Sequence, residues 1–125
     1  MNLTSIRGVE FDRFTVVLLL TPPEEPQLED AAAAELQDAH LNYLASLHEG
    51  GQLLAAGPLP GDPGRKFRGL SIFGVGPEEA RSLAEQDPAV QAGEFDIEVL
   101  PWLVPGGAVS FSAKRFPHSA AEAGG

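Results

Sequence analysis

Apolar residues recur with a helical period in the first half of the chain. Around His40 they stand four positions before and three, four and seven positions after, at Leu36, Tyr43, Leu44 and Leu47. Residues at these spacings share one side of an α-helix. The pattern predicts a helix over 29–49 that ends at Gly50-Gly51. It also predicts that His40 faces a core or a cavity rather than bulk water.

Four other segments carry the patterns of β-strands. The first, 11–20, contains a continuous apolar run that is typical of a strand buried on both faces or covered by an assembly partner. Further strands are predicted over 52–58, 67–75 and 95–104, the last because apolar residues alternate with acidic ones. Alternation along the third strand places four residues on one face: Phe67, Gly69, Ser71 and Phe73.

A second helix is predicted between the last two of these strands. Pro77 suits its first turn, and Asp87-Pro88 ends it because a residue before proline disfavours helical geometry. The order β-α-β-β-α-β is that of a ferredoxin-like domain. The sequence therefore predicts the α+β class, with two helices on one face of a four-stranded antiparallel sheet. The apolar first strand indicates that a second subunit covers the other face.

The length of 125 residues supports one domain. Residues 1–10 show no clear period, and we interpret them as a loosely held N-terminal leader. The α+β domain is predicted over 11–104. Residues 105–125 are interpreted as a partly disordered C-terminal extension that frays from Lys114, although the pattern allows one more short strand over 109–111.

Composition and charge narrow the classes of partner. Eighteen acidic and eight basic residues give a net charge of -10, which disfavours binding to the phosphate backbone of nucleic acids. The chain has no cysteine, so it has neither disulfides nor thiolate metal ligands. The apolar run 14–20 is shorter than the roughly 20 residues that span a bilayer. With no recognisable signal peptide, we expect a cytoplasmic protein without membrane association.

Three histidines are present, and only His40 combines a helical position with an apolar flank. His48 is expected to be solvated at the helix end, and His118 lies in the tail. On the pattern alone, His40 is more often a satisfied structural residue and Asp87 a cap or turn residue. One inward histidine and one aspartate fall short of the three ligands of a metal site, and nucleotide-binding motifs are absent. No metal or cofactor is predicted.

Gly57-Pro58 and Ser71 each allow a purely structural and a functional interpretation. Gly57-Pro58 either ends a strand or lets a ligand approach the backbone closely. Ser71 lies in the middle of a strand, on the face that also carries Gly69, and could offer its hydroxyl to a pocket. Most serines in strands have no such role, so the residues alone leave both positions undecided.

Short motifs follow one another in a specific order between residues 14 and 102. They are His40-Leu41, Leu53–Pro58 (LLAAGP), Pro77–Ala80, Asp87-Pro88 with Ala92-Gly93, and Pro101-Trp102. Together they resemble the YciI-like (YCII-related) proteins. The resemblance implies a ferredoxin-like domain that pairs as a homodimer with its sheets face to face, in a dimeric α+β barrel.

The resemblance also implies an active site, made of a histidine–aspartate pair in a cleft beside the sheet. By motif position these residues are His40 and Asp87. The implied function is a small cofactor-independent enzyme with lyase- or isomerase-like chemistry on a small molecule. His40 would move a proton and Asp87 would orient it, with Gly57, Pro58 and Ser71 lining the cleft. Two alternatives stay open: a non-catalytic binding or sensing dimer, and a dimeric assembly factor in which the pair is only a buried polar link.

Overall fold

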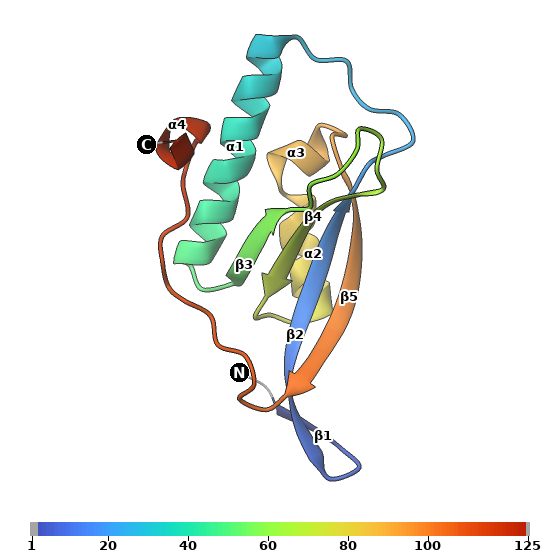
Figure 1. Cartoon of the computed structure of the whole chain (residues 1–125), viewed down its shortest axis with the longest axis vertical. Helices are drawn as coiled ribbons and strands as arrows, with labels where there is room; N and C mark the ends of the chain where they lie inside the picture. The colour runs from blue at the N-terminus through green and yellow to red at the C-terminus, as the bar shows by residue number, and fades with distance from the viewer. Residues whose placement is uncertain (1–2, 125) are drawn as a thin grey trace.

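β2 (Val9–Leu20) is the central strand of the sheet in the computed structural model, which describes residues 3–124 (Figure 1). β5 (Asp96–Pro105) pairs with it in antiparallel fashion along one edge. β4 (Phe67–Phe73) pairs with the other edge and is itself paired with β3 (Leu53–Pro58). The order β5-β2-β4-β3 is that of a ferredoxin-like domain, so the predicted α+β class is confirmed.

The sheet has five strands rather than the predicted four, because β1 (Leu3–Ile6) folds back on the start of β2. Arg7 and Gly8 make the turn between them with φ values of 50° and 81°. Two successive positive φ values are typical of a tight hairpin turn. The predicted leader is therefore wrong for residues 3–10, while residues 1–2 lie outside the described part. Arginine rarely adopts a positive φ, so the sequence carried little signal for this turn.

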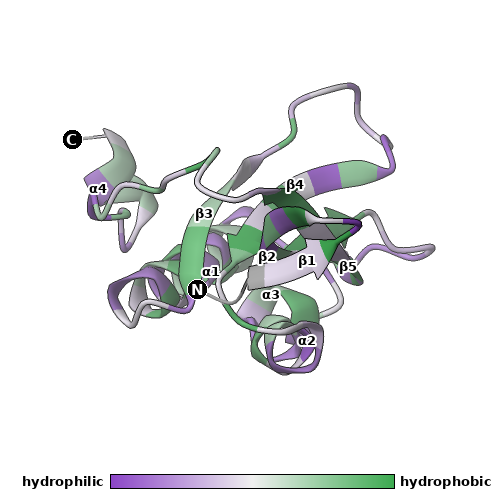
Figure 2. Cartoon of the chain, turned by 90° about the horizontal axis from the view of Figure 1, so that it is seen from below, coloured by the Kyte–Doolittle hydropathy of each residue, from purple (hydrophilic) through white to green (hydrophobic). Residues whose placement is uncertain are grey.

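Three helices lie on the same side of the sheet (Figure 2). They are α1 (Asp30–Glu49), α2 (Pro77–Glu85) and α3 (Pro88–Gln91). α1 stops where the sequence predicted, and Gly51 takes the positive φ of 85° that follows many helix ends. No helix within residues 3–124 is long and apolar enough to cross a membrane.

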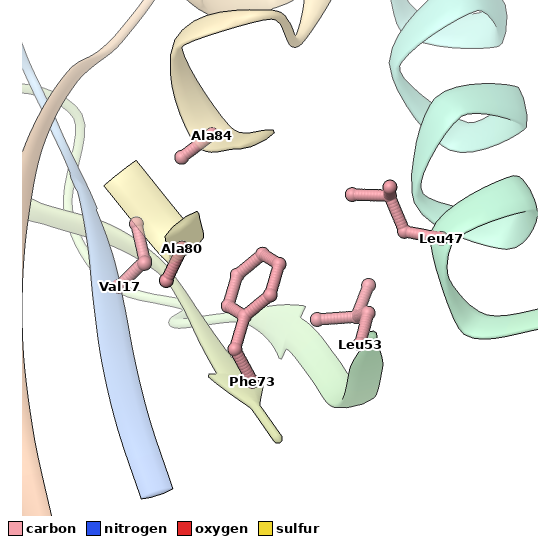
Figure 3. Close-up of a cluster of buried hydrophobic side chains, with 6 residues drawn as sticks. All are labelled: Val17, Leu47, Leu53, Phe73, Ala80 and Ala84. Atoms are coloured by element: carbon pink, nitrogen blue, oxygen red, sulfur yellow. The ribbon is translucent and has the colours of Figure 1, made fainter. Parts of the chain in front are cut away.

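The core lies between this helix layer and the sheet (Figure 3). Six buried side chains form it: Val17, Leu47, Leu53, Phe73, Ala80 and Ala84. Each large apolar side chain buried in this way stabilises the fold by about 1.5–3 kcal/mol. α2 contributes only alanines to this set, which lets its backbone approach the strands closely. The core thus ties α1 and α2 to the three neighbouring strands β2, β4 and β3.

The C-terminal residues return along α1 instead of fraying. They end in α4 (Ala120–Gly124), which lies beside α1 (Figure 1). His118, just before α4, holds this segment against α1, since its Nδ1 lies 2.6 Å from Asn42 Oδ1 and its Nε2 lies 2.6 Å from Glu49 Oε2. The predicted frayed tail is therefore wrong for residues 114–124, and Gly125 lies outside the described residues.

The sheet face opposite the helices is not covered by α1, α2 or α3 (Figure 2). Half-buried side chains of β2 point to it, at Val16, Leu18 and Leu20. Leu100 of β5 is 41% exposed. Residues 109–111 pair with no strand of the described chain, so the extra strand that the pattern allowed is absent there. Instead the Phe111 ring packs edge-on against Phe14, with centroids 5.3 Å apart.

We predict that a second copy of the chain covers this face. Leu18→Glu should convert the dimer into a monomer, because an unpaired carboxylate buried between two sheets costs far more than the leucine contributes. Sedimentation velocity measures the mass, and circular dichroism checks that the variant is folded. The matched control is Leu28→Glu, which changes an exposed leucine in the connection before α1. A wild-type chain that sediments as a monomer would contradict the prediction.

Candidate functional site

His40 and Asp87 meet between α1 and the junction of α2 with α3. His40 Nδ1 lies 2.7 Å from Asp87 Oδ2, although 47 residues separate them in the sequence. Both residues are buried, with only 8% of His40 and 3% of Asp87 exposed. The helical period placed His40 on the inward face of α1, and the packing of α1 against α3 brings Asp87 to it. The two residues predicted as catalytic are therefore in direct contact.

Asp87 is at the same time the N-cap of α3. Its Oδ1 accepts a hydrogen bond from the backbone N–H of Ala89 at 2.9 Å, and Pro88 occupies the first turn of the helix. Asp87 therefore caps a helix and contacts His40 at the same time, as both interpretations of this residue require. Because each carboxylate oxygen has its own partner, rotation of the group would break a hydrogen bond. Asp87 therefore holds the His40 ring in one orientation.

The contact determines which nitrogen of His40 faces a ligand. A carboxylate only accepts hydrogen bonds, so neutral His40 carries its proton on Nδ1. Nε2 then has a lone pair and is the nitrogen available to other groups. In this tautomer the imidazole is a base, and after taking a proton it is an acid.

A cavity of about 570 Å³ opens beside His40. Its size lies in the range of roughly 300–1,000 Å³ that is usual for small-molecule sites. All three residues predicted to line a cleft border it: Gly57, Pro58 and Ser71. At Gly57 an added Cβ would meet no atom within 4 Å, so the backbone there is open to close approach. Asp87 is not among the lining residues, so its effect on a ligand passes through His40.

The sequence did not predict several other residues of the cavity wall. They are Arg65, Arg68, Phe95 and Phe116. The pairing of β2 with β4 changes register between Leu19 and Leu20, which leaves Arg68 as an extra residue of β4 without a β2 partner. Such a bulge re-aims a side chain, whereas strict alternation would have turned Arg68 to the opposite face. No local pattern in the sequence marks this bulge.

The C-terminal segment forms one wall of the cavity, through Phe116, Pro117, Ala120 and Ala123. His48 anchors this segment. Its ring stacks on Phe116 with centroids 3.9 Å apart, and its Nε2 lies 2.9 Å from the backbone oxygen of Lys114. The prediction of a solvated His48 is therefore wrong. The described residues hold no group of three or more His, Asp or Glu side chains placed to bind a metal ion.

The YCII-related domain matches residues 15–103, which include His40 and Asp87. The chain belongs to the YCII-related family. Protein YciI of Escherichia coli O6:H1 is 37% identical over 75 residues, which cover 54% of this chain and 76% of the relative. Protein YciI of Shigella flexneri gives the same values. The family resemblance of the motifs is thus confirmed.

A solved structure shows the same fold. It is 5-chloro-2-hydroxyhydroquinone dehydrochlorinase (TftG) from Burkholderia phenoliruptrix AC1100, in complex with 2,5-dihydroxybenzoquinone. The TM-score is 0.53 at 22% sequence identity, and the match covers 71% of this YCII-related chain and 92% of the other. At this identity the likeness establishes the fold alone.

The pKa of Tyr43 is sensitive to its buried position and to the nearby Asp87 carboxylate. Its hydroxyl donates to the backbone oxygen of Leu83 at 2.7 Å. Burial, and secondly the negative charge of Asp87, raise the pKa of Tyr43 above its usual value of 10.0. The folded protein therefore holds this proton more tightly than the unfolded chain does. Stability should then fall as the pH rises above about 10, since the unfolded chain ionises first.

We predict that the free energy of unfolding of Tyr43→Phe falls less between neutral and alkaline pH than that of the wild type, because phenylalanine cannot ionise. The same change should lower the free energy of unfolding near neutral pH by about 1 kcal/mol, because the hydrogen bond to Leu83 is lost. Urea unfolding of both proteins at about pH 7 and about pH 10.5 measures both effects. An equal alkaline loss of stability in the two proteins would show that folding does not raise the pKa of Tyr43.

Proposed function

We propose that this protein is a small enzyme that transfers a proton on a small molecule, with lyase- or isomerase-like chemistry and without a cofactor. One observation carries the proposal: His40 and Asp87 form a buried hydrogen bond of 2.7 Å at the wall of a cavity of about 570 Å³. Burying an ionisable pair has a desolvation cost. Placing that pair beside an accessible cavity suits proton transfer to a ligand better than it suits stability alone.

The proposed role of His40 follows from its tautomer. Nε2 takes a proton from an O–H group or an activated C–H group of the substrate. The electron pair left behind moves toward a carbonyl oxygen or expels a leaving group. The Asp87 carboxylate, bonded to Nδ1–H, stabilises the positive charge of the imidazolium formed in this step. The proton then returns to another atom of the substrate in an isomerisation, or leaves with the departing group in an elimination.

The side chains of the cavity wall suit a flat, unsaturated substrate. Apolar side chains make up much of it, including Leu41, Leu44 and Phe95, while Ser71 adds a hydroxyl on the sheet side. A hydroxyl in that position suits a hydrogen bond to a substrate oxygen. The protein of the same fold is named as the dehydrochlorinase of a chlorinated hydroxyhydroquinone and is seen with a dihydroxybenzoquinone. Hydroxylated quinones and hydroquinones are therefore the first compounds to test.

We predict that His40→Gln lowers turnover by about 10²–10⁴-fold, the usual contribution of a general acid or base. Glutamine keeps a polar side chain of similar length but cannot take up a proton. Chloride release from 5-chloro-2-hydroxyhydroquinone measures elimination. Exchange of carbon-bound hydrogen for deuterium in hydroxyquinones, followed by NMR, measures proton transfer without a leaving group.

Asp87→Asn separates chemistry from folding. Asparagine is as good a helix cap as aspartate, so α3 should keep its N-terminal hydrogen bond and the thermal midpoint should change little. Its amide N–H would donate to Nδ1, which moves the proton of His40 to Nε2 and removes the base. The matched control is Glu85→Gln, which removes an exposed carboxylate at the end of α2.

Three results would decide between the proposal and its alternatives. Unchanged turnover in a folded His40→Gln protein would remove His40 from the mechanism. Binding of hydroxyquinones without turnover or exchange would favour a sensing module. Loss of thermal stability in both variants, with no compound bound by the wild type, would leave the pair as a structural link only.

A further inference from the structure

The wall of the cavity carries basic side chains and no carboxylate, although the protein is strongly acidic. The chain has 18 acidic and eight basic residues. Among the described residues, however, no Asp or Glu borders the cavity, whereas Arg65, Arg68 and His40 do. A small cavity with low-dielectric walls strengthens the field of the charges that line it. The residues that line the cavity therefore differ in composition from the rest of the chain, which is rich in Asp and Glu.

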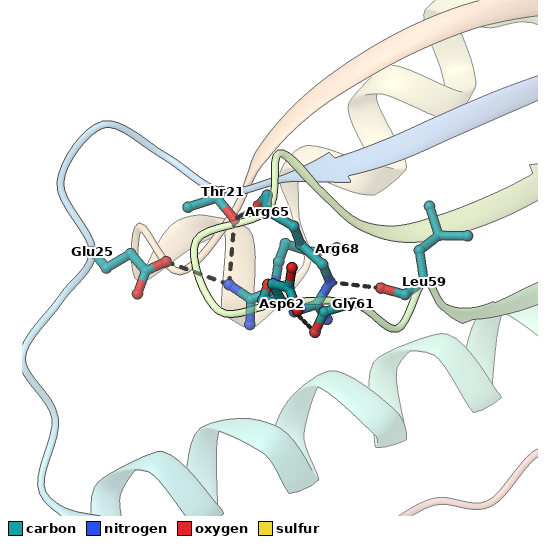
Figure 4. A network of polar contacts seen from close by, with 7 residues as sticks. All are labelled: Thr21, Glu25, Leu59, Gly61, Asp62, Arg65 and Arg68. Atoms are coloured by element: carbon teal, nitrogen blue, oxygen red, sulfur yellow. Dashed lines mark hydrogen bonds and ion pairs between the residues drawn. The ribbon is translucent and has the colours of Figure 1, made fainter.

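Arg65 is occupied by its own loop. Its Nε donates to the backbone oxygen of Leu59 at 2.8 Å, as Figure 4 shows. Its Nη1 donates to the backbone oxygens of Gly61 and Asp62 at 3.3 and 3.2 Å. These bonds shape the loop between β3 and β4. Arg65 contributes a positive charge to the cavity mouth but has few donors left for a ligand.

Arg68 is held much more weakly. Its Nη1 lies 3.5 Å from Thr21 Oγ1 and 3.4 Å from Glu25 Oε1 (Figure 4). Charge-assisted hydrogen bonds are usually about 2.7–2.9 Å long, so neither contact is a strong one. The Arg68 side chain is 25% exposed and that of Glu25 is 48% exposed. Exposed pairs of this kind contribute little to stability, so a ligand anion in the cavity could displace Glu25.

The bulge in β4 directs Arg68 to the same aromatic ring that His40 faces. Arg68 Cζ lies 5.4 Å from the centroid of the Phe95 ring. The His40 ring lies 5.9 Å from that centroid. Phe95 is thus a neighbour of both the cation and the proposed base, and all three side chains border the same cavity.

We propose that the natural substrate is a small aromatic or conjugated molecule that carries a carboxylate in addition to the hydroxyl or carbonyl group on which His40 acts. Its carboxylate is bound by Arg68, its ring lies beside Phe95, and its reacting group faces His40 Nε2. This inference deepens the proposed proton-transfer function and rests on it. A planar carboxylate matches the guanidinium fork, and a single weakly held arginine neutralises one negative charge better than the two of a phosphate. Arg68 is accordingly a specificity-determining residue.

Two probes of the same shape test the proposal in the wild-type protein. They are 4-hydroxybenzoate and 4-hydroxybenzamide, which differ in the charge of one group at neutral pH. We expect the acid to bind at least about tenfold more tightly than the amide, as measured by isothermal titration calorimetry. Equal affinity for the two probes, or no detectable binding of the acid, would overturn the proposal without the use of any variant.

Variants identify the residue responsible. Arg68→Met should reduce the preference for the acid to about twofold or less while leaving the amide affinity unchanged. Arg81→Met, on the exposed surface of α2, causes the same change in net charge and should keep the preference. Glu25→Gln should strengthen binding of the acid alone, because Arg68 loses its competing carboxylate. A preference retained in Arg68→Met would overturn the assignment.

His40→Gln separates this inference from the proposed function. The anion preference depends on Arg68, so it should survive in this variant even though turnover is lost. If His40→Gln binds the acid as the wild type does but turnover is also unchanged, the proton-transfer proposal fails and the anion site stands. If turnover falls as expected but the wild type shows no preference for the acid, the anion site fails and the proton-transfer proposal stands.

Discussion

The Asp87 carboxylate joins the helix layer to the candidate chemistry. One oxygen caps α3 through Ala89 and the other holds His40 of α1, so a single buried group links two helices. Removing it would leave a helix end uncapped and a buried imidazole N–H unpaired. Each loss typically costs on the order of 1 kcal/mol or more. A structural role and the proposed chemical role of this pair are therefore compatible, because the cap that Asp87 forms also fixes the orientation of the His40 ring.

The regular part of the fold could be predicted because local patterns report local structure. The helical period around His40 determined which face of α1 points inward, a continuous apolar run indicated the first predicted strand, and alternation indicated the last. The partner of His40 was a different problem. Asp87 has the local signature of a cap, which it is, and nothing near it in sequence points to a histidine 47 positions away. Only the order of the family motifs linked the two residues.

The features that sequence analysis missed all depend on contacts between distant segments. Arg68 enters the cavity through a change of register that is defined only when β2 and β4 pair. His48 looked solvated at a helix end, yet the returning chain covers it with Phe116. The β1 hairpin turns at Arg7, a residue type that does not usually mark such turns. In each case the residue has an ordinary local environment, and its role comes from tertiary pairing.

The residues that form the site come from two parts of the chain, the YCII-related domain and the C-terminal extension. His40, Asp87 and Arg68 lie within the residues that match the YCII-related domain, 15–103, whereas Phe116 and the rest of the C-terminal wall lie outside them. His40 is thus part of the shared domain, while the C-terminal wall of the cavity belongs to the extension. The negative surface charge acts over about 8 Å at physiological ionic strength, so it does not cancel a cation that contacts the ligand directly. The limit that the C-terminal wall sets on ligand size can therefore change without any change at His40, whereas the proposed selection of charge by Arg68 belongs to the same shared domain as His40.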